Sequence, residues 1–169
     1  MRKLLIVIDM QNDFIYGSLG TGEARAILPN VRKKIEEYRQ AGQDIVFTRD
    51  THDSHYLDTQ EGKNLPVPHC IQGTDGWQIA EGLYLDEKVF DKPTFGSQEL
   101  AAYVQACGYD EIALVGVCTD ICVLSNAVLI KTACPETPVK VYENCCAGVT
   151  PKAHEAAIAV LSSIQVEIL

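Results

Sequence analysis

The chain contains 169 residues, close to the size of one ordinary domain and enough to bury a core without disulfides. Its formal net charge is −9 at pH 7 and it has no basic block, which disfavours binding to nucleic acid or to an anionic membrane surface. We therefore expect a single domain over residues 1–169 that acts on a small molecule, with no nucleic-acid or membrane partner.

The cysteine content does not indicate a disulfide framework. Seven cysteines are spread through apolar runs, and their number is odd. The apolar run near the N-terminus is only about six residues long, too short for the core of a signal peptide or for a membrane span. These features predict a cytoplasmic protein with reduced thiols.

Strand-like and helix-like segments alternate along the chain. Strands are expected over 3–9, 43–50, 87–92, 111–117, 138–146 and 165–169, and helices over 29–40, 97–108, 121–134 and 152–164. Residues 51–76 show no sustained period, and so long a loop in a compact domain usually carries function. Nearly continuous Val, Ile and Leu in the strands indicate a sheet covered on both faces. The pattern predicts a single-domain, three-layer α/β/α fold with a mainly parallel, Rossmann-like sheet.

Three chemically distinct side chains follow expected strands. Asp9 ends the first strand, Lys92 the third, and Cys122 follows the strand over 111–117. In a parallel sheet function gathers at the carboxyl ends of the strands, so an acid, an amine and a thiol are expected to meet there. Cys122 also falls near the start of an expected helix, where the dipole and free N–H groups favour the thiolate. The sequence therefore predicts a cysteine-nucleophile enzyme.

The runs LIVIDMQNDF, KPTFGS and VGVCTDICV, in this order and spacing, resemble the isochorismatase-like cysteine hydrolases, and particularly the nicotinamidases. The resemblance spans residues 2–133, and the remaining βαβ pattern fits the family's fold. It implies a catalytic triad of Asp9, Lys92 and Cys122. It also implies a cis peptide between Val117 and Cys118 and an oxyanion hole built from the N–H groups of Cys118 and Cys122.

Cys118 departs from the family pattern, which usually has a small residue such as alanine at this position. A redox or resolving role for its thiol is an alternative to a purely structural one. The other cysteines are expected to be small core or loop residues.

The long loop holds a second set of candidate residues. It carries Asp50, His52, His55, Glu61 and His69, a mixture of imidazoles and carboxylates that suits Zn²⁺, Mn²⁺ or Fe²⁺. Asp50 and His52 are two apart, so they point the same way in an extended segment. Resemblance to the nicotinamidases implies Asp50, His52 and His69 as ligands, with a further position filled by His or Glu. The spacing favours Glu61, with His55 as the alternate.

The resemblance implies an amidase that converts nicotinamide to nicotinate and ammonia through a thioester. We expect one divalent ion, zinc before manganese or iron, and a homo-oligomer. Phe14, Leu65 and Val117 are expected to line the substrate pocket, although Leu65 and Pro66 stand where nicotinamidases often carry an aromatic residue beside the pyridine ring. Another small amide or carbamoyl compound is the alternative substrate. Two other classes remain open: a hydrolase that uses a metal-bound water, with Cys122 structural, and a non-catalytic binding or redox-sensing protein.

Overall fold

The computed structural model describes residues 1–169. Its six strands form one sheet in the order β3-β2-β1-β4-β5-β6, and all neighbouring strands are parallel. The strands are β1 (Lys3–Ile8), β2 (Asp44–Asp50), β3 (Lys88–Lys92), β4 (Glu111–Val117), β5 (Val139–Ala147) and β6 (Glu167–Ile168). The expected α/β fold with a parallel sheet is confirmed.

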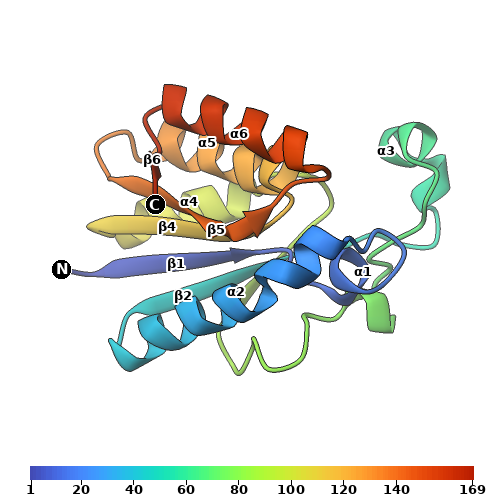
Figure 1. The fold of residues 1–169 in the computed structure, drawn as a ribbon, viewed down its shortest axis with the longest axis horizontal. Helices are drawn as coiled ribbons and strands as arrows, with labels where there is room; N and C mark the ends of the chain where they lie inside the picture. Colours follow the sequence, from blue (N-terminus) through green and yellow to red (C-terminus); the bar gives the residue numbers. More distant parts are fainter.

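Helices cover both faces of this sheet (Figure 1). One face packs against α2 (Gly22–Gln40), and the other against α4 (Gln98–Cys107), α5 (Leu124–Ala133) and α6 (Pro151–Ser163). Alternate side chains of β1 therefore enter two separate apolar layers. Leu4 and Ile6 pack on the side of α4, α5 and α6, whereas Leu5 and Val7 pack on the side of α2. This double burial explains the unbroken apolar run in β1.

Helix α2 begins at Gly22, so the expectation of a start at Pro29 is wrong. Thr21 caps the helix, since its hydroxyl accepts a hydrogen bond from the Ala24 N–H at 3.0 Å. Pro29 lies inside the helix, where it removes one backbone donor without ending the element. The cap at Thr21 therefore adds two turns ahead of the proline.

The expected loop over 51–76 contains short helical turns. They are η1 (Tyr56–Asp58), α3 (Gln60–Asn64) and η2 (Asp75–Trp77), and a further short helix, α1 (Asn12–Ile15), follows β1. Each is too short to produce a periodic pattern in the sequence. In Figure 1, α3 projects beyond the carboxyl ends of the strands on the right of the molecule.

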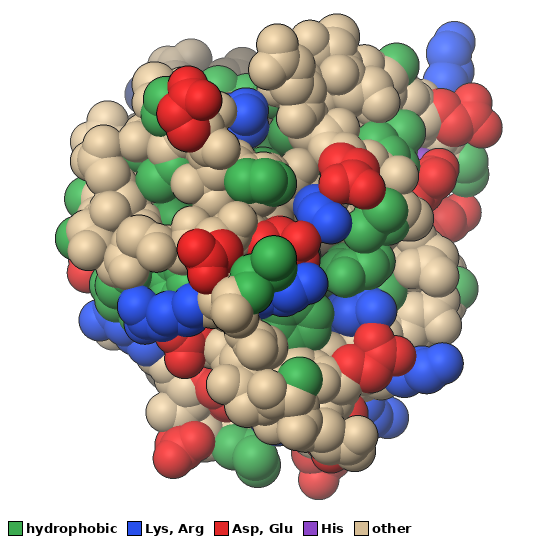
Figure 2. All heavy atoms as spheres, turned by 90° about the vertical axis from the view of Figure 1, so that its left-hand side faces the viewer, with side chains coloured by type: hydrophobic (Ala, Val, Ile, Leu, Met, Phe, Trp, Pro, Cys, Tyr) green, Lys and Arg blue, Asp and Glu red, His purple; other side chains and the backbone are tan.

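The amino ends of the strands form a face on which acidic and basic side chains are interspersed (Figure 2). Ion pairs cross between neighbouring strands here, including Arg2–Asp44 at 2.8 Å, Lys3–Glu111 at 2.9 Å and Lys140–Glu111 at 3.0 Å. This face therefore presents no block of positive charge. No helix of the protein combines the length and the apolar character needed to cross a membrane.

Strand order reverses between β1 and β4, because the chain runs outward from β1 through β2 to β3 and then returns to the other side of β1. In open α/β sheets, ligands bind beyond the carboxyl ends of the strands at such a reversal. A ligand-binding site is therefore expected at the right-hand end of the sheet in Figure 1, next to α1 and α3.

Candidate active site

Four neighbouring strands deliver polar side chains to this end of the sheet. Asp9 follows β1, Asp50 ends β2, Lys92 ends β3, and Cys122 lies in the turn after β4. All four are buried. The parallel topology thus brings together residues that are far apart in the sequence.

Lys92 connects the three candidate catalytic residues. Its Nζ lies 2.7 Å from Asp9 Oδ2, 3.5 Å from Cys122 Sγ and 3.5 Å from Asp50 Oδ1. The other Asp9 oxygen accepts a hydrogen bond of 2.6 Å from the Thr48 hydroxyl. Asp9 also has a positive φ of 47°, a conformation uncommon outside glycine that clusters at functional sites. The structure therefore brings an acid, an amine and a thiol into one buried contact.

The electrostatics of this contact differ from the sequence-based expectation for Cys122. Burial, followed by the nearby Asp9 carboxylate, raises the pKa of the Cys122 thiol well above its ordinary value. The direction of this shift is opposite to the expected stabilisation of the thiolate by a helix N-terminus. Burial also raises the pKa of Asp9, although Lys92 opposes this shift. A thiol with a raised pKa needs a base to become a nucleophile, and the Asp9 carboxylate shares the contact with Lys92 that this thiol makes.

Cys122 lies in a distorted turn that precedes a regular helix. Residues Thr119–Val123 form a single π-helical turn, η3, and α5 begins only at Leu124. The Val123 N–H reaches back to the Cys118 carbonyl at 3.1 Å. Such π turns occur frequently at functional sites because they redirect one or two side chains. Here the turn directs the Cys122 side chain toward Lys92.

The peptide bond between Val117 and Cys118 is cis, as the family resemblance implies. Just before it, β4 carries a register shift, and Gly116 has a φ of 121°. A side chain at this glycine would collide with the Ile8 carbonyl of the neighbouring strand. The Cys118 N–H, which lies outside β4 and the π turn, makes no hydrogen bond within the chain. It is therefore free to donate to a ligand.

A compact set of four potential metal ligands lies beside the triad. Asp50, His52, Glu61 and His69 each offer one atom, and these atoms lie within 4.8 Å of one another. His52 Nε2 is 2.9 Å from Asp50 Oδ2, and Glu61 Oε1 is 3.7 Å from the Nε2 atoms of both histidines. Two carboxylates and two imidazoles converging on one point match the donor set of a transition-metal or zinc site.

The orientation of His69 fits a metal ligand. Its Nδ1 donates a hydrogen bond of 2.8 Å to the Val67 carbonyl, so Nε2 faces the cluster. A backbone partner of this kind commonly fixes the tautomer of a metal-binding histidine. His55 lies outside the cluster: its side chain is 78% exposed and its ring nitrogen lies 3.5 Å from Asp53.

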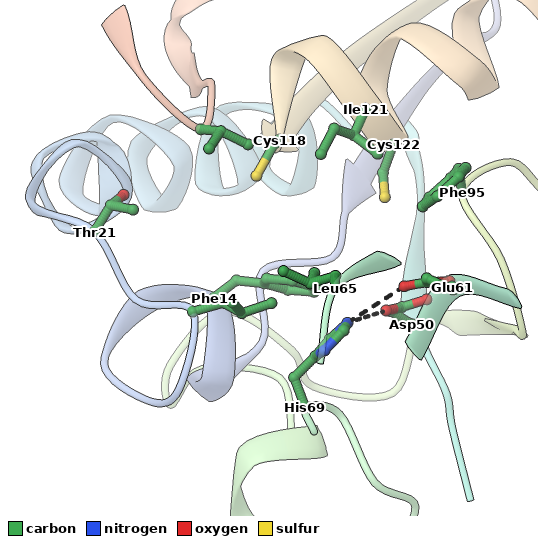
Figure 3. Close-up of a pocket in the computed structure, with 12 residues that line it drawn as sticks. Phe14, Thr21, Asp50, Glu61, Leu65, His69, Phe95, Cys118, Ile121 and Cys122 are labelled. Atoms are coloured by element: carbon green, nitrogen blue, oxygen red, sulfur yellow. Dashed lines mark ion pairs between the residues drawn. The ribbon is translucent and has the colours of Figure 1, made fainter. Parts of the chain in front are cut away.

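A cavity of about 240 Å³ separates the nucleophile turn from the ligand cluster. Figure 3 shows Cys118 and Cys122 pointing into it from one side, with Phe14, Leu65 and His69 on the other. The remaining lining residues are Leu19, Thr21, Asp50, Glu61, Phe95, Ile121 and Val149. Val117 does not line the cavity, which corrects the sequence-based expectation: it packs in the core on the α2 side and is 1% exposed.

Sequence reasoning missed Gln11, which is fully buried. Its side-chain oxygen accepts a hydrogen bond of 2.7 Å from the Asp50 N–H, and its amide nitrogen donates to the carbonyls of Asp50 at 2.8 Å and Trp77 at 2.9 Å. Gln11 therefore fixes the main chain of a potential metal ligand. Its place inside DMQNDF was a signal, since an amide next to a strand end has to find buried partners.

The chain belongs to the isochorismatase family, whose domain model matches residues 3–169. A protein from Arabidopsis thaliana named "Probable inactive nicotinamidase" is 30% identical and aligns over 96% of this chain and 89% of its own length. The nicotinamidase/pyrazinamidase of Mycobacterium tuberculosis is 29% identical, over 74% of this chain and 76% of its own.

Solved structures show the same fold along the whole chain. The pyrazinamidase of Pyrococcus horikoshii in complex with zinc has a TM-score of 0.88 and 28% identity, covering 100% of this chain and 99% of its own. The N-carbamoylsarcosine amidase of Thermoplasma acidophilum has a TM-score of 0.84 and 26% identity, covering 99% and 95%. The fold is therefore common to relatives named for different amide substrates.

Proposed function

We propose that this protein is a cysteine-dependent amide hydrolase that converts nicotinamide to nicotinate and ammonia. The observation that carries the proposal is the contact of Lys92 with both Asp9 and Cys122 at the wall of a small cavity. One relative is named as an inactive nicotinamidase, but in this chain the acid, the amine and the thiol are all present and in contact. We therefore propose an active enzyme.

Asp9 acts as the general base in the first half of the reaction. It takes the proton of the Cys122 thiol while the Lys92 ammonium stabilises the charge that develops, and the sulfur attacks the amide carbon. The N–H groups of Cys118 and Cys122 donate to the oxyanion, a contribution of about 3–4 kcal/mol per donor in other acyl-transfer enzymes. Asp9 then passes its proton to the leaving nitrogen, so that ammonia departs and a thioester remains on Cys122.

Water completes the reaction. Asp9, again a carboxylate, accepts a proton from the water molecule as its oxygen attacks the thioester carbon. The carbon–sulfur bond breaks, and the proton returns to the Cys122 sulfur. The acid product leaves, and both Asp9 and Cys122 regain their starting protonation states.

Asp50, His52, Glu61 and His69 are the residues that would hold a divalent ion, with zinc the first candidate. When bound, such an ion supplies a Lewis-acidic contact for a lone pair of the substrate, such as a ring nitrogen, and thereby orients the substrate. The chain's own apolar residues, Phe14 and Leu65, flank the ring across the cavity from Cys122 (Figure 3).

Loss of the Gln11 side-chain amide is expected to weaken metal binding. Gln11→Met removes the donor and the acceptor that hold the Asp50 main chain, and changes to such supporting partners typically cost about 10- to 100-fold in affinity. Gln43→Met is the matched control, because Gln43 joins the same two strands at their amino ends, where its side chain accepts from the Lys3 N–H at 2.7 Å. Zinc affinities measured by competition with a chelator should fall for the first variant only. Equal affinities would contradict the role of Gln11.

A carbamoyl compound is the second candidate substrate, because the structural neighbour from Thermoplasma acidophilum is an N-carbamoylsarcosine amidase with 26% identity. The cavity argues against a substrate that bears a carboxylate. No lysine or arginine lines it, and the charge of a divalent ion at the Asp50–Glu61 cluster would already be balanced by those two carboxylates. An unpaired buried charge costs about 3–5 kcal/mol.

Ammonia release therefore tests the function directly. We expect kcat/KM for nicotinamide to exceed that for N-carbamoylsarcosine by about 100-fold or more, the factor that corresponds to an uncompensated charge. Pyrazinamide, which is also a neutral ring amide, should be hydrolysed. Faster release from the carboxylate-bearing compound would transfer the proposal to the second candidate, and no release from any small amide would overturn it.

A further inference from the structure

Two hydrogen bonds join the turn that carries Cys122 to the corner between β5 and α6. The Thr119 hydroxyl lies 2.8 Å from His154 Nδ1, and the Asp120 side chain accepts from the Val149 N–H at 3.0 Å. The two segments are about 30 residues apart in the sequence. None of these residues belongs to the triad or to the ligand cluster.

Thr119 is fully buried and lies in the sequence between Cys118, whose N–H is proposed for the oxyanion hole, and the proposed nucleophile Cys122. It follows the Cys118 amide directly and precedes Cys122 by three positions. Its hydroxyl has one hydrogen-bond partner, His154. A buried hydroxyl left without a partner is costly, so the position of His154 constrains the first residue of the π turn.

His154 is itself held in place. It lies in the first turns of α6, whose Pro151 and Thr150 cap fix the helix start. The ring is largely buried, with 17% of the side chain exposed, and its Nε2 lies 3.8 Å from the exposed Glu143 carboxylate. Gly148 packs so closely against the His154 backbone and the Asp120 carboxylate that a larger residue would collide with both. The corner is therefore closely packed against the turn.

We propose that His154 is a positioning residue that acts through Thr119 to hold the Cys118 amide and the Cys122 thiol in their reactive arrangement. The same contact sets one wall of the cavity, since Val149 and Ile121 from the two joined segments both line it. This inference rests on the proposed function for its turnover measurements, but its thiol measurement does not.

Removing either side of the hydrogen bond should lower kcat and leave KM nearly unchanged. Thr119→Val and His154→Leu should each reduce kcat by about 10-fold, as expected for a small misplacement of reacting groups, with KM within about twofold. The double variant should lose no more than either single variant, because both remove the same contact. Thr119→Ser and His154→Asn, which each keep a hydrogen-bonding group, should retain activity within about twofold.

The reactivity of Cys122 provides a measurement independent of turnover. Its alkylation by iodoacetamide, followed at the single residue by fragment-ion mass spectrometry, should slow by about 10-fold in Thr119→Val and His154→Leu. If the wild-type protein hydrolysed no nicotinamide while alkylation of Cys122 was still slower in the two variants, the proposed function would be overturned and the inference supported.

Two controls separate positioning from general stability. Thr132→Val removes a hydroxyl that bonds only to its own helix at Val128, and Glu143→Gln removes the charge beside His154. Both should leave kcat and alkylation unchanged. The inference is overturned if Thr119→Val and His154→Leu lower the Tm without slowing alkylation, or if the double variant shows the product of the two single losses.

Discussion

Replacing Cys122 with alanine is expected to abolish amide hydrolysis while the fold remains intact. The thiol is the only sulfhydryl or hydroxyl group in hydrogen-bond contact with Lys92, and removal of the nucleophile in a comparable catalytic set lowers kcat by about 10⁶-fold. The side chain is small, so its loss leaves little empty volume in the core. Ammonia release at saturating substrate measures the loss, and circular dichroism with a Tm measurement verifies the fold.

Cys118→Ala is the matched control for this prediction. Its side chain lines the cavity, but only its backbone N–H takes part in the proposed reaction, and its thiol makes no hydrogen bond with Asp9 or Lys92. Burial raises the pKa of Cys118 to about 12 and also raises that of Cys122, so it is the contact with Lys92, made only by Cys122, that distinguishes the two thiols. A small loss is expected. If Cys118→Ala were inactive and Cys122→Ala active, the nucleophile would be Cys118. If both retained activity that a chelator removed, a metal-bound water would be the better explanation.

The strands, and the functional side chains that follow them, were predictable because burial on both faces of the sheet leaves long apolar runs in the sequence. The runs that became β1 and β4 are almost entirely apolar, and every position of β4 is buried. Since all strands are parallel, the residues that end or follow them had to gather at one edge. Asp9, Lys92 and Cys122 could therefore be placed together from the sequence without knowledge of any side-chain contact.

The depth of burial could not be predicted from the same signal. A helix N-terminus and a buried pocket shift the pKa of a thiol in opposite directions, and the sequence shows only the first. Val117 illustrates a related limit: it ends a strand whose two faces are equally apolar, so the sequence does not reveal whether its side chain faces the cavity or the core.

Contacts between distant segments were also beyond the reach of the sequence. Gln11 binds the Asp50 main chain across 39 positions, and Thr119 meets His154 across 35. Nothing in local periodicity marks either pair. Both kinds of contact depend on where β2 and α6 lie relative to the β1 and β4 ends, which only the assembled sheet determines.

Substitutions at His52, Glu61 and His69 are expected to remove the divalent ion. Each would delete one of four converging ligands, and the loss should weaken metal binding by more than about 100-fold, beyond the typical effect of a supporting residue. His52→Ala and His69→Ala should in addition raise KM for nicotinamide strongly, because substrate orientation is lost. Elemental analysis after equilibrium dialysis measures the bound ion directly, whatever the activity of the variant.

Glu61 and His55 provide the sharpest comparison within this set. Glu61 Oε1 lies 3.7 Å from the Nε2 atoms of both His52 and His69, although α3, which carries it, projects from the body of the protein. His55 is three positions from His52 but 78% exposed and directed toward Asp53. Metal content should therefore fall in Glu61→Ala and survive in His55→Ala. The reverse result would make His55 the ligand, and it would require the 53–61 segment to refold around the ion, because the present arrangement turns that imidazole toward solvent.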